Sequence, residues 1–324
     1  MSTPAKMKVV CGTMSFGAPN TRGSPHINTV EQATEVLEVF QRHGHNELDS
    51  ARAYGEGTTE KLLGDLQWQD RGLKMDTKLY PSAGHAMEKG TGYTHKPEDL
   101  RRGLLDSLAA LKTDKIDIFY LHGPDRATPY EDTLRAVDEL HREGYFDRFG
   151  VSNYMAWEVA QMCEISARHG WIAPTAYEGH YHALQRRAAD ELLPCLRHYG
   201  VSLYVYSPLA SGFLTGRYAR GGREVDNLHL RMLWNSGYYD ALDIIQPVAD
   251  RLGLTVAEMA LRWLVHHAGL KPELGDAVIL GAGGVKNLES NLVDLEKGPL
   301  PDEAVKALDD AWLVCKAYAP KYWY

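Results

Sequence analysis

The chain has 324 residues, 44% of them hydrophobic and 24% charged, which is typical of a globular protein that buries a large core. Acidic residues outnumber basic ones by 43 to 35, and the formal net charge of −8 disfavours a nucleic-acid partner. No segment approaches the roughly 18 uncharged apolar residues of a membrane span. The first residues also lack the hydrophobic region of a secretion signal. We therefore expect a cytoplasmic protein without a membrane partner.

Short apolar runs alternate with amphipathic windows along the whole chain. The runs typical of strands span residues 8–11, 47–49, 74–78, 116–121, 149–152, 175–178, 202–206 and 277–280. The windows typical of helices span residues 29–43, 58–67, 97–111, 131–143, 156–169, 188–199, 256–267, 287–296 and 302–315. In residues 97–111, for example, Leu100, Leu104 and Leu108 recur at every fourth position and form one apolar stripe.

This order predicts a (β/α)8 TIM barrel that residues 1–324 form as a single domain. The apolar runs suit parallel strands covered on both faces, and no hairpin signal separates them. A doubly wound sheet is the alternative. However, residues 12–17 lack the Gly-x-Gly-x-x-Gly pattern that such a sheet carries after its first strand.

Two connections are longer than the rest, at residues 80–95 and 207–239. In a barrel both lie at the C-terminal ends of the strands, where active sites are built. The glycine-rich residues 220–223 fit a loop that closes over a ligand. We expect the last helical window and the tail after it to lie over the same mouth.

Four polar residues occupy positions at or after predicted strand ends: Asp49, Tyr54, Lys78 and His122. A lysine at the end of a buried strand needs an anion, and Asp49 is the natural partner. The cation would lower the pKa of Tyr54 from about 10 and make it a general acid near neutral pH. His122 would donate a hydrogen bond to a carbonyl oxygen. A purely structural Asp49–Lys78 pair is the alternative.

Proton donation to a carbonyl needs an electron source, and the residues suggest a nicotinamide. The scattered cysteines Cys11, Cys163, Cys195 and Cys315 suit reduced thiols, and the 14 histidines form no helical pair with an acid, so we expect no metal. Hydride from a nicotinamide is then the simplest supply. Tyr206 offers an aromatic face, and Ser152 and Asn153 offer partners for a carboxamide. Tyr206 as a plain core aromatic is the alternative.

At these residues the chain resembles the aldo-keto reductase superfamily. The motifs read DSARAYG at 49–55, TK at 77–78, YLH at 120–122, GVSN at 150–153, YSPL at 206–209, ILGA at 279–282 and ExN at 289–291. Together they are specific, and with their flanks they cover nearly the whole barrel. Residues 121–125, 128–134 and 213–218 resemble the aflatoxin-aldehyde reductase branch.

The resemblance implies a barrel that binds NADPH and reduces aldehydes or ketones to alcohols. Tyr54 would be the proton donor, Lys78 and Asp49 would adjust its pKa, and His122 would orient the carbonyl. The cofactor contacts implied are Ser152, Asn153, Glu178, Tyr206, Ser207, Leu209, Gly216, Arg217, Gly281, Lys286, Glu289 and Asn291. The substrate contacts expected are Met14, Phe16, Tyr54, His122, Arg231, Trp234 and Trp323.

Three departures from the family pattern affect ligand binding. Glu178 stands where the family usually has glutamine, and a carboxylate accepts hydrogen bonds but donates none. Residues 283–285 lack the usual partners of a 2′-phosphate and leave Lys286, with Arg217 and Arg223, as cations, so NADPH is favoured but NADH stays open. The chain ends in aromatic residues instead of an arginine, which favours a bulky or aromatic aldehyde over a small acid semialdehyde.

A second function also fits the resemblance. Residues 181–186 are similar to the potassium-channel β-subunits, cofactor-sensing regulatory proteins with weak reductase activity. The intact set of Asp49, Tyr54, Lys78 and His122 favours the enzyme over this alternative. An isomerase barrel finds no carboxylate base at a strand end beyond Asp49. The branch is often dimeric, so a homodimer is open.

Overall fold

Eight parallel strands close into a barrel in the described part of the chain, in the order β1 to β8, with β8 paired to β1. This computed structural model describes residues 6–21, 23, 25–84, 92–216, 235–281 and 283–324. The strands are β1 Lys8–Gly12, β2 Glu47–Asp49, β3 Lys74–Leu79, β4 Ile116–Leu121, β5 Phe146–Ser152, β6 Ala176–His180, β7 Ser202–Tyr206 and β8 Ala277–Gly281. The predicted (β/α)8 barrel is thereby confirmed.

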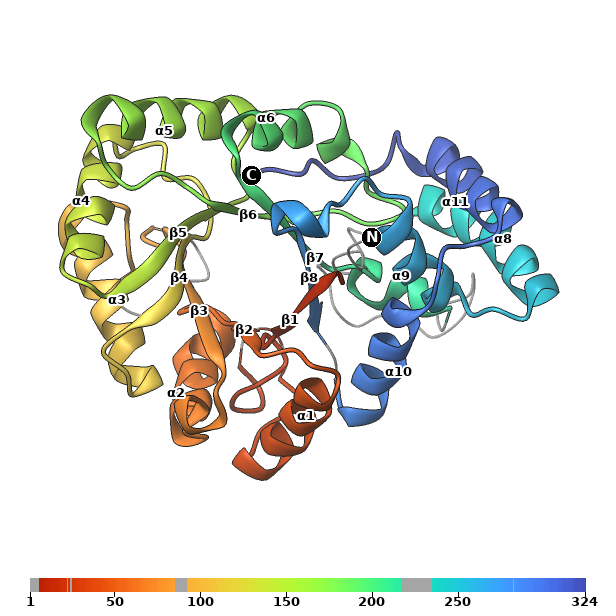
Figure 1. The fold of residues 1–324 in the computed structure, drawn as a ribbon, viewed down its shortest axis with the longest axis horizontal. Coiled ribbons are helices and arrows are strands. Elements are labelled where there is room, and N and C mark those ends of the chain that lie inside the picture. Colours follow the sequence, from red (N-terminus) through yellow and green to blue (C-terminus); the bar gives the residue numbers. More distant parts are fainter. Residues whose placement is uncertain (1–5, 22, 24, 85–91, 217–234, 282) are drawn as a thin grey trace, which may run out of the picture.

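A ring of helices surrounds the barrel (Figure 1). The helices are α1 Val30–Arg42, α2 Thr58–Asp65, α3 Pro97–Leu111, α4 Tyr130–Arg142, α5 Ala156–His169, α6 Leu192–Tyr199, α8 Ser236–Leu252, α9 Val256–His266, α10 Val285–Glu296 and α11 Asp302–Cys315. Several of these helices begin at a residue whose side chain caps the free backbone amides of the first turn. The side chains of Thr29 and Thr255, for example, accept hydrogen bonds from the first turns of α1 and α9. Within the described residues, no helix is long and apolar enough to cross a membrane.

Helix α8 is the main element that the sequence did not predict. The long connection expected at 207–239 overlaps its start, and Pro247 inside it is a residue that normally ends a helix. Pro247 is exposed, so its ring meets solvent. The buried side chains Ala241, Leu242 and Ile245 pack α8 against its neighbours, of which α11 shares the most extensive contact. This packing outweighs the local cost of the proline.

The hydrophobic core has two layers. The larger lies between the strands and the helices, and it includes Leu37, Leu104 and Leu264. The smaller fills the barrel interior, where Tyr120 and Tyr204 are the largest members. Tyr120 lies against Gly150 of β5, and a Cβ at Gly150 would come within 2.3 Å of its ring. Glycine at position 150 is therefore what admits an aromatic ring into the barrel.

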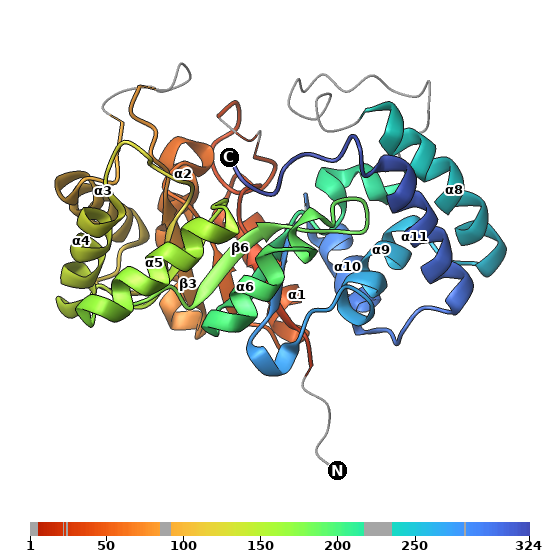
Figure 2. The ribbon, with the colours of Figure 1, turned by 90° about the horizontal axis from the view of Figure 1, so that it is seen from above.

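The C-terminal tail crosses the end of the barrel where the strands finish. In Figure 2, the connection after β3 and the tail lie on one side of the molecule, and the start of β1 lies on the other. Helix α11 packs at the side, against α8 and α9, so only the tail after it reaches the mouth. The Tyr324 amide donates to the Asn153 carbonyl at 3.2 Å, which fixes the tail beside the end of β5.

Candidate active site

The barrel brings the four predicted residues to one place. Asp49 ends β2, Lys78 lies one residue before the end of β3, and His122 directly follows β4. Tyr54 begins a short 3-10 helix, η1 (Tyr54–Gly57), after β2. Because parallel strands finish at the same end of a barrel, residues distant in sequence meet there.

Lys78 is the centre of the site. Its side chain is 0% exposed, and its ammonium hydrogen-bonds to Asp49 Oδ1, to the Ser50 carbonyl at 2.8 Å and to the Tyr54 hydroxyl at 3.4 Å. Burial alone would lower the pKa of Lys78, but the charges of Asp49 and Glu178 outweigh it, and the pKa lies above its usual value. The lysine is therefore a permanent cation.

The Tyr54 phenol differs from the sequence expectation in its electrostatics. Burial raises its pKa, Lys78 opposes that effect, and Asp49 and Glu178 reinforce it, so the net pKa lies above 10. The expected lowering by Lys78 is real but is not the largest effect. The sequence could not show this, because it gives neither the burial of the phenol nor its distances to the carboxylates. Tyr54 is thus protonated at neutral pH and able to donate.

Two tyrosine rings hold the His122 imidazole edge-on. The ring of Tyr54 lies 5.7 Å away at 79°, and the ring of Tyr80 lies 5.8 Å away at 88°. The Asn153 amide donates to the His122 carbonyl at 3.0 Å. Tyr80 was not among the predicted residues, and its position directly after β3 is the only signal in the sequence that pointed to it.

Glu178, which was predicted as a cofactor contact, is buried inside the barrel beside Lys78. The residue is 3% exposed, and its Oε2 lies 3.4 Å from Lys78 Nζ. Its carboxyl also hydrogen-bonds with that of Asp49, and burial followed by the charge of Asp49 raises its pKa well above the usual range. Glu178 therefore belongs to the same buried cluster as Asp49 and Lys78.

Beside this cluster, Ser152, Asn153 and Tyr206 form a second group. Asn153 adopts φ 66°, and its amide donates to Ser152 Oγ at 2.9 Å. The Tyr206 hydroxyl donates to Asn153 Oδ1 at 2.8 Å, and its ring stacks on that of His180 at 5.3 Å and 7°. His180 was not predicted. These contacts fix the orientation of the aromatic face and the amide that were expected to meet a nicotinamide.

The remaining predicted cofactor residues lie between β7 and α10. Ser207 and Leu209 follow β7, and Gly216 ends the 3-10 helix η4 (Ala210–Thr215). Gly281 ends β8, Lys286 and Glu289 are exposed on α10, and Asn291 is partly buried there. Arg217 and Arg223 lie outside the described residues.

Two glycines leave space beside the backbone between β8 and α10. A Cβ at Gly281 would meet only Gly12 O, at 3.8 Å, and one at Gly284 would meet nothing within 4 Å. The backbone at the start of α10 is thus open to a phosphate. At the other end, the buried Glu178 Oε1 has no hydrogen-bond partner in the described part of the chain and is free to accept from a carboxamide.

The predicted substrate residues are only partly brought together. Met14 is 53% exposed, and Trp323 is partly exposed in the tail. Phe16 is 1% exposed and packs in the outer core. The predicted Arg231 and Trp234 lie outside the described residues.

One cluster of carboxylates could in principle hold a metal. The ligand atoms of Glu47, Asp76 and Asp117 lie within 4.8 Å of one another. However, Lys8 forms an ion pair with Glu47, and Arg148 with Asp117 at 3.0 Å. These cations already balance the acids, so the cluster reads as a structural network in the barrel wall.

Comparison with known proteins places this geometry in a family. The model of the aldo/keto reductase family matches residues 8–313. An aldo-keto reductase of Pseudocercospora fijiensis is 47% identical over 89% of this chain and 99% of its own length. Aldo-keto reductase pigE of Monascus ruber is 41% identical over 100% of this chain and 99% of its own length. Aflatoxin B1 aldehyde reductase member 2 of Mus musculus is 38% identical over 98% of this chain and 88% of its own length.

Proposed function

The chain belongs to the aldo/keto reductase family and is an oxidoreductase of carbonyl compounds, and on this premise we propose that it reduces bulky or aromatic aldehydes with NADPH and with Tyr54 as the general acid. The observation that carries the proposal is the position of the Tyr54 hydroxyl, 3.4 Å from the buried Lys78 ammonium and beside the His122 ring.

The residues account for proton transfer to the substrate oxygen. A bound nicotinamide would supply the hydride. Tyr54 donates its proton to the carbonyl oxygen as negative charge develops there. Lys78 then stabilises the phenolate, and Asp49 holds Lys78 in place. His122 offers a second contact that orients the oxygen.

The second group of residues supports binding of the nicotinamide. Ser152, Asn153 and Tyr206 are joined by hydrogen bonds and would offer a nicotinamide partners for its carboxamide and an aromatic ring. Lys286, exposed on the first turn of α10, is a cation suited to a 2′-phosphate. This supports NADPH over NADH.

Aromatic side chains at the mouth support a bulky substrate. Tyr80 packs against His122, and Trp323 and the exposed Met14 lie near the same end of the barrel. The Tyr324 phenol hydrogen-bonds with Tyr206. Apolar and aromatic walls favour an aromatic ring over a small charged semialdehyde.

Purified protein tests the proposal directly. We expect it to oxidise NADPH in the presence of 4-nitrobenzaldehyde and to do so faster than with succinic semialdehyde. A fluorescence titration should give tighter binding of NADPH than of NADH. Absence of turnover with every aldehyde of a graded panel would contradict the proposed activity. Preference for the semialdehyde would contradict only the substrate class.

A further inference from the structure

Glu178 faces ionisable groups from several neighbouring elements. It is the third residue of β6, and Asp49 from β2 and Lys78 from β3 lie within hydrogen-bond or ion-pair distance. Tyr54 from η1 and Tyr120 from β4 are also coupled to it electrostatically. Two carboxyl groups therefore share one ammonium inside the barrel.

The ammonium gives Glu178 only a long contact, because its donors have other partners. A lysine has three N–H donors. In Lys78 these have three partners, namely Asp49 Oδ1, the Ser50 carbonyl and the Tyr54 hydroxyl. Glu178 Oε2 lies at 3.4 Å, so its hydrogen bond with the ammonium is long and competes with these three. An ionised Glu178 would thus be a buried anion without its full complement of hydrogen bonds, which is costly.

A shared proton explains the contact between the carboxyl groups of Glu178 and Asp49. Two oxygens in hydrogen-bond contact need a proton between them, and like charges at that distance cannot both persist in a buried site. Asp49 already accepts from Lys78 and is the better anion. We propose that Glu178 is a protonated acid whose O–H donates to the Asp49 carboxylate, so that the buried cluster holds one negative and one positive charge.

This arrangement makes Glu178 a positioning residue for Lys78. Its proton gives the Asp49 carboxylate a second hydrogen bond, and the field at Tyr54 is set by one anion instead of two. Burial and the charge of Asp49 raise the pKa of Glu178 well above the usual range, in agreement with the geometry. Glu178 Oε1 remains an acceptor for a carboxamide N–H, a step that rests on the proposed function.

Infrared difference spectroscopy tests the protonation without any cofactor. At about neutral pH, the spectrum of wild type minus Glu178→Gln should contain the carbonyl band of a protonated carboxyl group, shifted in heavy water. Glu158→Gln is the matched control, because Glu158 is buried but paired with Arg126 at 2.8 Å, and its difference spectrum should contain only carboxylate bands. A carboxylate-only spectrum for Glu178→Gln would overturn the proposal.

A second measurement keeps the test independent of how well that variant folds. In wild type with carboxyl-labelled glutamate, the band should carry the label shift and persist in Glu60→Gln, which removes the other buried glutamate whose burial raises its pKa. A band that disappears in Glu60→Gln would overturn the assignment. If the Glu178 band is present but NADPH does not bind, only the proposed function fails. If NADPH binds and the band is absent, only this inference fails.

The pH dependence of cofactor binding gives a further readout. Ionisation of Glu178 at high pH adds a second buried anion, so the dissociation constant of NADPH for wild type should rise with pH. Glu178→Gln cannot ionise, and its dissociation constant should lack this rise. A parallel pH profile in the two proteins would contradict the proposed shared proton.

Discussion

At the residue scale, the site depends on one buried cation. Lys78 is enclosed by Asp49, Glu178, Ser50 and Tyr54, and no water is needed to satisfy its three donors. Removing one partner of a buried ion pair leaves the other charge unpaired in a low dielectric. The site is therefore most sensitive to change at position 78.

Lys78→Met should destabilise the protein by about 3–5 kcal/mol at neutral pH, because Asp49 stays buried without its counterion. The loss should shrink as pH falls. In acid, protonation of the unpaired carboxylate removes the buried charge. Urea unfolding at several pH values measures this. Lys306→Met, on the exposed face of α11, is the control and should change stability little. A loss that does not depend on pH would contradict the ion-pair account.

The sequence was a good guide to which polar residues the barrel brings together and a poor guide to their electrostatics. Asp49, Lys78 and His122 were predictable because each is a polar residue at or directly after a buried strand. The net rise in the pKa of Tyr54 was not, because it depends on how deeply the phenol is buried and then on its distances to Asp49 and Glu178. The contact between those two carboxyls joins residues far apart in sequence and was invisible for the same reason.

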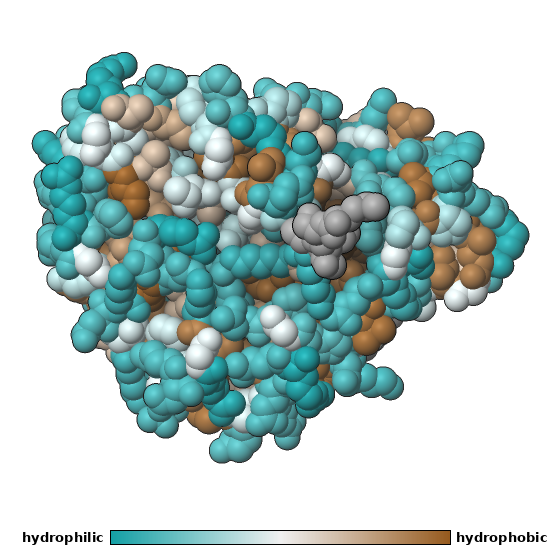
Figure 3. All heavy atoms as spheres, viewed as in Figure 1, coloured by the Kyte–Doolittle hydropathy of each residue, from teal (hydrophilic) through white to brown (hydrophobic). Residues whose placement is uncertain are grey.

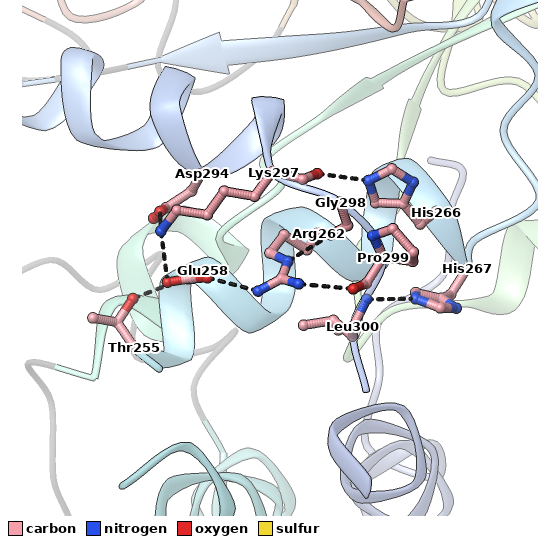
Figure 4. A network of polar contacts seen from close by, with 10 residues as sticks. All are labelled: Thr255, Glu258, Arg262, His266, His267, Asp294, Lys297, Gly298, Pro299 and Leu300. Carbon is pink, nitrogen blue, oxygen red and sulfur yellow. Dashed lines mark hydrogen bonds and ion pairs between the residues drawn. The ribbon is translucent and has the colours of Figure 1, made fainter. Parts of the chain in front are cut away.

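At the element scale, a polar network joins α9 to the segment after α10 (Figure 4). Glu258 binds Arg262 at 2.7 Å and Lys297 at 2.8 Å. Arg262 donates to the carbonyls of Gly298 and Pro299. His267, just past α9, accepts the Leu300 amide at 3.1 Å. The network fixes the turn that leads from α10 into α11.

His267 should make this turn sensitive to acid. Its ring nitrogen accepts a hydrogen bond, so it must be neutral, and burial followed by the charge of His266 lowers its pKa. A lowered pKa gives stability that is present above the usual histidine pKa of 6.5 and is lost as pH falls through the lower folded value. The Tm difference between wild type and His267→Ala should therefore be largest above that pH and should decrease in acid. A difference that grows in acid would contradict this role.

Strand β5 should tolerate no side chain at Gly150. An added Cβ would lie 2.3 Å from the Tyr120 ring, so Gly150→Ala forces the ring or the strand to move. Overpacking of this kind costs about 1–3 kcal/mol. Thermal or urea unfolding measures the loss. Gly298→Ala, where a Cβ would meet nothing within 4 Å, is the control. Equal stability of the two variants would contradict the proposed fit of Tyr120.

Most elements followed from local patterns, and the exceptions have physical causes. Both ends of helix α3 were predicted correctly, because Pro97 indicates where the helix begins and the leucine stripe indicates how far it extends. The missed helix α8 contains Gly237 and Pro247, and its stability comes from packing on α11, which a local pattern cannot show. Strand β5 begins at Phe146, before the predicted start at residue 149. The prediction missed this start because the exposed Asp147 and the partly buried Arg148 interrupt the apolar run.

At the scale of the whole molecule, pairing of the first strand, β1, with the last strand, β8, closes the barrel. Lys8 to Gly12 pair in register with Ala277 to Gly281. Figure 3 shows a surface of mixed polarity, with hydrophobic residues scattered among hydrophilic ones on the face in view. Because each strand is paired on both sides, no strand of the barrel has an open edge within the described residues.

We propose that this closed barrel unfolds as one domain. Loss of either terminal strand would open the sheet and expose the interior core, so partial unfolding should be unfavourable. Far-ultraviolet and near-ultraviolet circular dichroism should therefore report the same midpoint in urea. Two separated transitions would contradict a single domain formed by residues 1–324.

We propose that the protein as a whole reduces a carbonyl group to an alcohol, with hydride from a nicotinamide and a proton from the single donor Tyr54. The most direct measurement is the kcat of Tyr54→Phe with NADPH and 4-nitrobenzaldehyde, alongside the dissociation constant of NADPH. Tyr199→Phe, on the outer surface, is the control. Our account predicts that Tyr54→Phe lowers kcat by about 10²–10⁴-fold while NADPH still binds. Turnover by Tyr54→Phe at the wild-type rate would contradict the assignment of Tyr54 as the general acid.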